Sequence, residues 1–218
     1  MPKPKHFIIT IDGPAASGKG TVSRLLADHL KLPYLDTGLS YRAVAHVLKT
    51  QKKSLDNIKL AEQVAKKIDF NDFNKDLLSR HPIGNAASKI AVMGSVRRIL
   101  VQQQRNFANI PPGAILDGRD VGTIVCPDAQ VKFYIIASDT IRAKRRWEEM
   151  MNKREGKTEN YDRILEDIRQ RDTRDQSRED SPLHPANDAY LIDTSKMSIE
   201  EMFRACLEIV NRHKYLEI

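Results

Sequence analysis

The sequence predicts an α/β protein in which a parallel β-sheet is covered by helices on both faces. Short apolar runs without alternation, at residues 7–11, 114–116 and 131–136, are typical of strands buried on both sides. Stretches with helical spacing separate these runs, which is the pattern of a parallel sheet. Turn-forming and charged residues follow the runs directly, where such folds bind their ligands.

Residues 1–31 are expected to contain a strand, a glycine-rich turn and a helix. The β-branched run at 7–11 ends at the turn sequence Asp12-Gly13-Pro14. From Lys19 onward, apolar residues recur at helical spacing as far as Leu30. A second short strand is expected at 32–35 and a helix at 41–48.

The middle of the chain divides into a poorly patterned part and a helical part. Residues 60–68 predict a helix, whereas 69–85 are polar and contain Asn, Asp, Pro and Gly, which predicts a loop or irregular insert. Residues 88–107 predict one long helix, with apolar positions at Ile90, Val92, Val96, Leu100 and Phe107. Pro111-Pro112-Gly113 ends it ahead of the strand at 114–116.

Two charged helices, at about 139–154 and 161–175, are expected after the strand at 131–136. A last strand is expected at 190–192. Ser198 and Glu201 have the spacing of a capping box that opens the final helix. Its inward positions are Met202, Phe203, Cys206, Ile209 and Val210.

The composition excludes several classes of protein. The net charge of the 218 residues is +7, but residues 139–180 hold 12 basic and 12 acidic side chains, and aromatic residues are only 6%. A nucleic-acid-binding module needs a patch of one sign with stacking aromatics, so we expect no nucleic-acid partner. With no long apolar run, no visible secretory signal and only Cys126 and Cys206, we expect a cytoplasmic protein without a membrane partner.

A glycine-rich loop stands between the first strand and the first helix. Gly13-Pro14-Ala15-Ala16-Ser17-Gly18-Lys19-Gly20-Thr21 contains GxxxxGK, the pattern of a nucleoside-triphosphate loop, or P-loop. Backbone amides and the helix N-terminus would surround phosphate oxygens, and Lys19 would supply a positive charge. Gly20 follows the lysine where many loops have a hydroxyl, so both Ser17 and Thr21 are candidates for placing Mg²⁺.

Three more blocks follow later strands and helices. They are Leu35-Asp36-Thr37-Gly38-Leu39-Ser40-Tyr41-Arg42, Asp117-Gly118-Arg119-Asp120-Val121-Gly122-Thr123 and Arg171-Asp172-Thr173-Arg174-Asp175-Gln176-Ser177-Arg178. With GPAASGKGT they resemble the bacterial cytidylate kinases over about residues 8–210. Many nucleoside monophosphate kinases share GKGT, whereas the DTGxxYR and DGRDxGT blocks together are more specific. The resemblance implies a P-loop kinase fold that transfers a phosphoryl group from ATP, with Mg²⁺, to CMP and to dCMP.

The resemblance also implies which residues contact the acceptor nucleotide. These are Thr37, Arg42, Ser88, Arg97, Arg119, Asp120, Asp175 and Arg178. Arg42 and Arg119 suit the phosphate through bidentate contacts. Ser88, Arg97 and Asp120 stand at the family's cytosine-reading positions, where a carboxylate accepting from the amino group would lose that bond to uracil. Asp175 and Arg178 stand where the family contacts the sugar hydroxyls.

The catalytic candidates are Lys19, Asp117 and the arginines of the charged helices. In related kinases this segment is a lid, and Arg142, Arg145 and Arg146, with Arg154 nearby, are expected to reach the transferring phosphoryl group. Arginines beside Glu148 and Glu149 are equally typical of a solvated helix face. Asp117 either orients the site or Mg²⁺, or serves as a structural turn acid.

We therefore expect one kinase domain over residues 1–218. Its core is about 5–36, 108–138 and 185–218, its monophosphate-binding lobe about 37–107 and its lid about 139–180. The family often has a larger β-rich insert before Asn85-Ala86-Ala87-Ser88, so the polar stretch 69–84 resembles a shortened one. We expect a monomer, and we assign no cluster of protein side chains as metal ligands.

Two other functions are compatible with parts of the sequence. A related kinase could act on UMP or AMP, although Ser88, Arg97 and Asp120 suit an amino-pyrimidine better. A GTP-binding switch protein would read guanine with Asn-Lys-x-Asp. The two near misses, Asn74-Lys75-Asp76-Leu77 and Asn152-Lys153-Arg154-Glu155, lack the final Asp.

Overall fold

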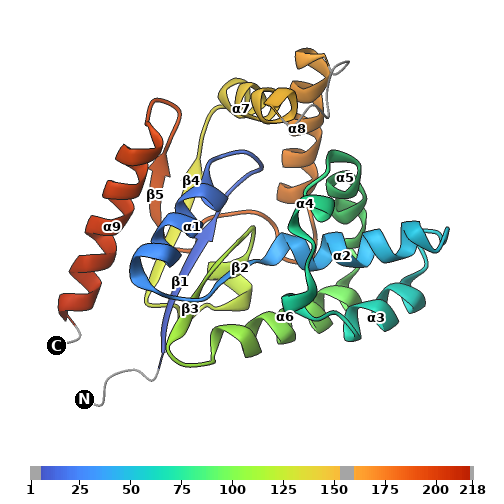
Figure 1. Ribbon diagram of the computed structural model, residues 1–218, viewed down its shortest axis with the longest axis horizontal. Helices are drawn as coiled ribbons and strands as arrows, with labels where there is room; N and C mark the ends of the chain where they lie inside the picture. Colours follow the sequence, from blue (N-terminus) through green and yellow to red (C-terminus); the bar gives the residue numbers. More distant parts are fainter. Residues whose placement is uncertain (1–5, 153–159, 217–218) are drawn as a thin grey trace.

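The computed structural model describes residues 6–152 and 160–216 and is built around a five-stranded sheet in which every pairing is parallel (Figure 1). The spatial order is β2-β3-β1-β4-β5. The strands are β1 (Phe7–Asp12), β2 (Tyr34–Asp36), β3 (Gly113–Gly118), β4 (Val131–Ile136) and β5 (Tyr190–Asp193). The predicted fold class is confirmed. The register sets Asp12 beside Gly118 and Asp36 beside Asp117, so the carboxyl ends of three strands meet at one edge.

Each face of the sheet has its own core. On one face, Ile9 and Ile11 of β1 pack with α1 (Lys19–Leu30) and α9 (Ile199–Leu216). On the other face, Ile8 packs with α6 (Gly94–Ala108) and with the π-helical turn η2 (Val121–Val125). Successive residues of a strand point to opposite faces, which explains why a continuous apolar run suits this strand.

A helical lobe lies beside the sheet and has a separate core. It consists of α2 (Thr37–Thr50), α3 (Ile58–Lys66), η1 (Phe70–Asp72), α4 (Lys75–Leu78), α5 (His81–Ile90) and α6. Val44 and Leu48 of α2 pack with Ile90, Val96 and Leu100 from the last two helices. Within residues 37–112, all of which the structure describes, there is no β-strand, so this lobe is entirely helical.

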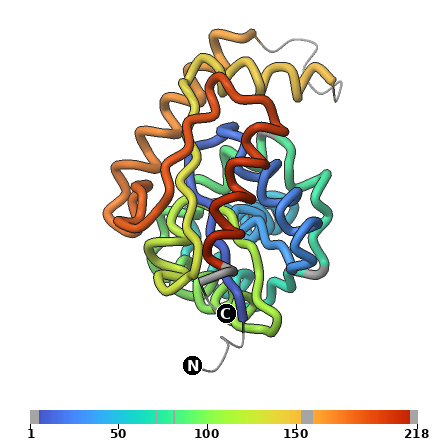
Figure 2. Tube along the Cα trace, turned by 90° about the vertical axis from the view of Figure 1, so that its left-hand side faces the viewer, coloured from blue at the N-terminus to red at the C-terminus, as the bar shows by residue number. Residues whose placement is uncertain are grey.

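Helices α7 (Asp139–Asn152) and α8 (Tyr161–Gln176) form a pair over the carboxyl edge of the sheet. Figures 1 and 2 both place this pair at the opposite end of the molecule from the start of β1 and the end of α9. Ala143, Met150, Ile164 and Ile168 form a small core between the two helices, with Trp147 against it. Arg154, named above as a nearby lid arginine, lies outside the described residues.

The prediction of a loop or irregular insert at 69–85 was wrong. The segment contains η1, α4 and the first half of α5. The Asn74 side chain caps α4 by accepting from the Leu77 amide at 3.0 Å, and Leu78 and Ile83 are buried against α2. Helices this short show too few turns for a visible apolar period.

The single helix predicted at 88–107 is two helices. Helix α5 ends at Ile90, α6 begins at Gly94, and Val92 between them is 55% exposed. Arg97 donates from Nη1 to the Ala91 carbonyl at 3.0 Å and so stabilises the turn. The break lets Ser88 of α5 and Arg97 of α6 face the same cavity.

The helix termini follow local hydrogen bonds. Helix α2 begins at Thr37, four residues earlier than the sequence predicted, because the Asp36 carboxylate caps it by accepting from the Gly38 amide at 2.9 Å. The Ser198–Glu201 capping box is confirmed by reciprocal bonds of 2.8 and 3.2 Å. Among the described helices, none combines the length and the apolar character needed to cross a bilayer.

Candidate active site

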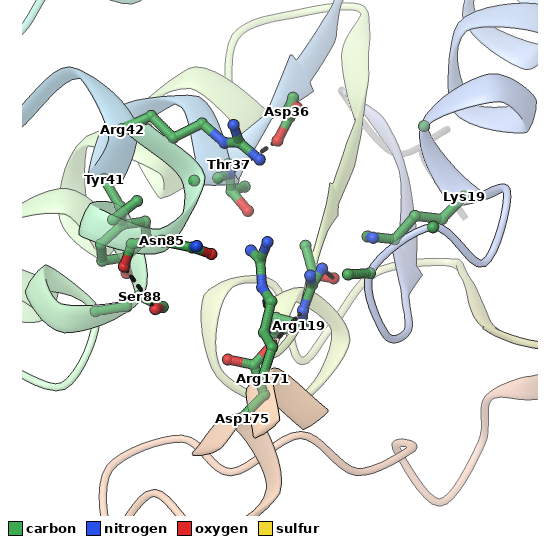
Figure 3. Close-up of a pocket in the computed structure, with 18 of the residues that line it drawn as sticks. Lys19, Asp36, Thr37, Tyr41, Arg42, Asn85, Ser88, Arg119, Arg171 and Asp175 are labelled. Carbon is green, nitrogen blue, oxygen red and sulfur yellow. Dashed lines mark hydrogen bonds and ion pairs between the residues drawn. The ribbon is translucent and has the colours of Figure 1, made fainter. Parts of the chain in front are cut away.

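A cavity of about 230 Å³ lies at the carboxyl edge of the sheet. The phosphate loop, the start of α2, helix α5, the end of β3 and helix α8 form its walls. Figure 3 shows Lys19, Arg119 and Arg171 reaching into this space from different elements. The cavity therefore collects side chains that are far apart in the sequence, as expected at the ends of parallel strands.

The phosphate loop needs glycine at two positions. Gly13 has a φ of 148°, and a Cβ there would lie 2.0 Å from the Ile135 carbonyl oxygen. Gly18 has a φ of 96° and stands at the N-cap of α1. Both backbone conformations are ones that other residues rarely adopt. The loop thus leaves the first amides of α1 turned toward the space beside Lys19.

Lys19 and Asp117 lie together at the head of the cavity, where burial shifts the pKa of each toward that of the other. Lys19 donates from Nζ to the Pro14 carbonyl at 3.0 Å. Burial, and then the nearby Arg119 charge, lower the pKa of Lys19. Burial, and then the Asp36 carboxylate, raise the pKa of Asp117. Each group therefore holds its charge less firmly than in water, and an added anion beside Lys19 would stabilise the cation.

Asp117 explains why the loop reads Gly-Lys-Gly. A Cβ at Gly20 would lie 3.2 Å from Asp117 Oδ2 and 3.8 Å from the Tyr34 hydroxyl. Tyr34 donates to the same carboxylate oxygen at 3.3 Å. Because glycine has no Cβ, position 20 leaves space for the Asp117 carboxylate and its hydrogen bond from Tyr34. Ser17, one of the two hydroxyl candidates, is buried, and its Oγ has no hydrogen bond within the described part of the chain.

A group of cations surrounds the middle of the cavity. Arg119 donates from Nε to Asp175 Oδ2 at 2.8 Å and from Nη1 to the Gly118 carbonyl at 3.1 Å. Burial, and then the Arg119 charge, lower the pKa of Arg171 to about 9. Its buried Nε makes no hydrogen bond among the described residues, and the nearest carboxylate oxygen, Asp175 Oδ2, is 3.9 Å away. Asp175 instead raises the pKa of Arg119, so Arg171 is the cation of this pair that lacks a close anion.

Arg42 and Thr37 line the same space from helix α2. Arg42 donates from Nη1 to the Leu78 carbonyl at 2.9 Å, and its guanidinium passes over Gly84, where a Cβ would lie 3.2 Å from either Nη. The Thr37 hydroxyl donates to the Asp117 carbonyl at 2.7 Å. Thr37 therefore ties the start of α2 to the end of β3, and its oxygen can only accept a further bond.

A buried ion pair between Arg97 Nη2 and Asp120 Oδ2 closes the far end of the cavity. Both side chains are less than a tenth exposed, and the Arg97 guanidinium lies 5.5 Å from the centre of the Tyr41 ring. Ser88 lines the same region. Asp120 is followed by two amides, of Val121 and Gly122, that donate to the Asp12 carboxylate at 2.9 and 2.7 Å, which fixes this turn.

Arg142 and Arg145 of helix α7 bind backbone carbonyls of the phosphate loop. Arg142 donates through both Nη atoms to the Asp172 carboxylate, at 3.1 and 2.5 Å, and reaches the Ala15 carbonyl at 3.3 Å. Arg145 donates to the Thr194 carbonyl at 2.7 Å and reaches the Ser17 carbonyl at 3.4 Å. Both side chains therefore support the loop, and neither lines the 230 Å³ cavity.

Arg146 is placed differently. It lines the first cavity and also a second one, of about 590 Å³, on the other side of the phosphate loop. Its Nη1 donates to Glu149 at 2.9 Å. Arg145 lines this second cavity as well. Met197 and Met202 also line it, so it has room for a group with an apolar face. Arg146 stands between the two cavities.

The two cavities bring together most of the site residues that the sequence predicted, although Gly13, Pro14 and Ser17 of the phosphate loop line neither. Lys19, Asp117, Arg146 and all eight acceptor candidates line the first cavity, whereas Arg142 and Arg145 lie behind it. The sequence assigned no role to Asp36, Tyr41, Asn85 or Arg171, which also line it. The spacing of Arg171 and Asp175, four residues apart on one helix face, was a signal for the arginine.

The comparisons with known proteins agree on one family. The profile of the cytidylate kinase family matches residues 9–212. A cytidylate kinase of Bartonella henselae is 56% identical over 207 residues, covering 95% of each chain. One of Mesorhizobium japonicum is 55% identical over 205 residues, covering 94% of each.

Solved structures with low sequence identity share the fold alone. An uncharacterized protein from Eubacterium ventriosum has a TM-score of 0.56 at 13% identity, covering 95% of this chain and 99% of that one. A gluconokinase from Sinorhizobium meliloti has a TM-score of 0.51 at 11% identity, covering 99% of each chain. The family profile and the close relatives carry the assignment: this chain belongs to the cytidylate kinase family.

Proposed function

We propose that this protein transfers the γ-phosphoryl group of ATP to the phosphate of CMP, giving ADP and CDP. Membership of the cytidylate kinase family makes it a phosphotransferase that acts on CMP with ATP. The supporting observation in the structure is one cavity that runs from Lys19 at the phosphate loop to the Arg97–Asp120 pair. A nucleoside monophosphate has a phosphate at one end and a base at the other, which suits this polarity.

The acceptor phosphate is proposed to lie among Arg42, Arg119 and Arg171. Two of them carry donors with no protein partner within the described ranges, Arg171 Nε and Arg119 Nη2. Planar guanidinium groups bind phosphate oxygens through paired hydrogen bonds. Here one oxygen of the CMP phosphate would form the new bond to the γ-phosphorus as the bond to the ADP oxygen breaks. Such transfer depends on positioning and charge neutralisation more than on a strong base.

The base is proposed to lie against Ser88, Arg97 and Asp120. Asp120 Oδ2 accepts from Arg97, which leaves Oδ1 as an acceptor for the cytosine amino group. Uracil would turn a carbonyl oxygen toward the same carboxylate. The ion pair therefore supports the choice of an amino-pyrimidine, and removing either partner would leave a buried charge unpaired.

The sugar is proposed to lie beside Asp175 and Arg178. Arg178 Nη2 is buried without a hydrogen bond in the described part of the chain, and its Nε donates to the Asp175 carbonyl at 3.3 Å. The Asp175 carboxylate also has a partner within the protein, because it forms an ion pair with Arg119. A 2′-deoxy sugar would therefore forgo a contact without leaving Asp175 unpaired, so we propose dCMP as a second acceptor.

ATP is proposed to bind along the phosphate loop, with its base in the second cavity. Arg146 lies where it can reach the transferring group, while Arg142 and Arg145 hold the loop in place. Among these three, Arg146 is the proposed catalytic residue, because it lines both cavities. The lid role of 139–180, the lobe role of 37–107 and the monomeric state remain predictions.

Mg²⁺ is proposed to accompany ATP. No group of three or more His, Cys, Asp or Glu side chains among the described residues forms a metal cage. Asp117 and Asp36 nevertheless lie at the head of the cavity beside Lys19, and Mg²⁺ commonly uses one or two carboxylates together with phosphate oxygens and water. The two carboxylates of Asp36 and Asp117 fit this kind of Mg²⁺ coordination. When bound, the ion would neutralise charge on the phosphates.

The experiment that tests this proposal is a coupled assay of ADP release with ATP and Mg²⁺. CMP, dCMP, UMP, AMP and GMP are offered separately at matched concentrations. We expect the highest kcat/KM with CMP, comparable or lower turnover with dCMP and little with UMP. A highest rate with UMP or AMP would retain the kinase and overturn the acceptor assignment.

A further inference from the structure

We propose that Arg174 fixes the direction of the Ser88 hydroxyl, so that Ser88 acts as a hydrogen-bond acceptor that favours an amino-pyrimidine over uracil. The inference rests on the proposed function and adds a positioning residue to it. Arg174 belongs to helix α8, whereas Ser88 belongs to helix α5 on the opposite wall of the cavity.

The hydrogen bonds at Ser88 leave no choice of direction. Its Oγ lies 2.9 Å from the Asn85 carbonyl oxygen, which can only accept, so Ser88 donates there. Its Oγ also lies 3.0 Å from Arg174 Nη1, which can only donate, so Ser88 accepts there. A serine hydroxyl has one proton and two lone pairs. The proton and one lone pair are therefore used, and a single lone pair remains for a ligand.

The remaining lone pair can distinguish the two pyrimidines. Ser88 is 8% exposed and lines the cavity together with Asp120. A cytosine amino group has two N–H bonds and can donate to acceptors on this wall. Uracil carries a carbonyl oxygen at that position, and Ser88 could donate to it only by giving up its bond to Asn85. Buried acceptors left without a donor disfavour the wrong ligand strongly.

Arg174 acts from outside the cavity. Its side chain is exposed and does not line the cavity, and its Nε donates to the Gln170 carbonyl of its own helix at 3.3 Å. Without Arg174, the Ser88 oxygen keeps both lone pairs available and its side chain can rotate. The hydroxyl could then turn its proton toward a carbonyl. Arg174 is thus expected to influence discrimination between bases while leaving phosphoryl transfer itself intact.

The test measures kcat and KM for CMP and UMP in wild type, R174M and R174K, with R163M as a matched control. Arg163 is another exposed arginine of α8 and does not line the cavity. For R174M we expect the CMP-to-UMP ratio of kcat/KM to fall about fivefold to tenfold, the scale of one ordinary intramolecular hydrogen bond. The change should lie in KM, with kcat for CMP within about twofold. R174K should recover most of the ratio because an ammonium group also donates, and R163M should match wild type.

A double variant separates action through Ser88 from a general structural effect. In S88A, adding R174M should leave the CMP-to-UMP ratio unchanged, because the group that Arg174 orients is absent. If R174M leaves the wild-type ratio unchanged, or lowers it further in S88A, the inference is wrong. R174A serves as the second variant if R174M does not fold. Failure of the proposed function is distinguishable, because wild type alone would then not prefer CMP.

Discussion

Arg119 Nε and Asp175 Oδ2 lie 2.8 Å apart and join the end of strand β3 to helix α8. Burial would raise the pKa of Asp175, but Arg119 and Arg171 hold that pKa below its ordinary value. The carboxylate therefore stays charged and keeps two arginines at the cavity wall. In the proposed complex, this acid would hold the two cations beside the acceptor phosphate without neutralising both of them.

Replacing Lys19 with alanine is expected to lower kcat by about 10²–10³-fold, since the charge it offers to the transferring group is lost. The fold should be retained, because its main hydrogen bond, to the Pro14 carbonyl, lies within the loop. Coupled ADP release and circular dichroism measure the two effects. The control K66A changes an exposed lysine of α3. Retention of wild-type kcat in K19A would contradict the phosphate-loop assignment.

Replacing Asp120 with asparagine is expected to lower the CMP-to-UMP ratio of kcat/KM by at least about tenfold. The asparagine keeps the size of the side chain but places an amide donor where cytosine needs an acceptor. The unfolding free energy should fall by about 3–5 kcal/mol, because Arg97 loses its buried partner. Kinetics with both nucleotides and urea denaturation test these effects. An unaltered preference for CMP would remove Asp120 from the base-reading set.

The profile of kcat/KM against pH is expected to be bell-shaped. Asp117 must be ionised, so activity falls as the pH drops below its raised pKa. Lys19 must be protonated, so activity falls as the pH rises above its lowered pKa. The bell should be narrower than the ordinary values of 3.8 and 10.5 would give, and both limbs belong to the coupled pair.

The variant D117N tests the assignment of those limbs. In D117N, the decrease of kcat/KM at low pH should be only the part that comes from protonation of the nucleotides. Its alkaline limb should move to lower pH, because Asp117 supports the charge of Lys19. D76N, at an exposed aspartate of α4, is the matched control and shares the titration of the nucleotides. An acid limb that is the same in D117N and D76N would assign it to another group.

Replacing Arg142 with methionine is expected to lower the unfolding free energy by about 3–5 kcal/mol. Its guanidinium is 6% exposed and holds the Asp172 carboxylate, which would be left unpaired. D172N should have a similar cost, and the double variant should cost less than the sum. Urea denaturation measures all three. A variant with full stability but a large loss of kcat would instead indicate direct contact with the phosphoryl group.

The sequence predicted the sheet and its loop well because their signals are local. Continuous apolar runs such as Ala114 to Leu116, and the glycines at 13 and 18, have physical requirements that neighbouring residues do not alter. The break between Ile90 and Gly94 was missed because no proline or glycine marks it until α6 has begun. The turn is held instead by Arg97, a side chain from the following helix.

The candidate site residues were predicted mainly through motif resemblance. The sequence could not show which arginines of helix α8 are buried at the cavity. A helix with Arg169, Arg171 and Arg174 among acids is the pattern of a solvated face. Arg169 does pair with Asp139 at an exposed position. Arg171 has the same local sequence character but faces the cavity, because α8 packs across the carboxyl edge of the sheet. Only the tertiary arrangement distinguishes the exposed Arg169 from the cavity-lining Arg171.

Helix α8 contacts both halves of the site through neighbouring residues. Asp172 holds Arg142, which reaches the Ala15 carbonyl of the phosphate loop, while Asp175 holds Arg119 beside the proposed acceptor site. A ligand that fixes this helix from one side also reduces the ordering cost that the other ligand meets. Thermodynamic linkage requires the benefit to be reciprocal. The two nucleotides should therefore bind with positive cooperativity, each raising the affinity for the other by the same factor.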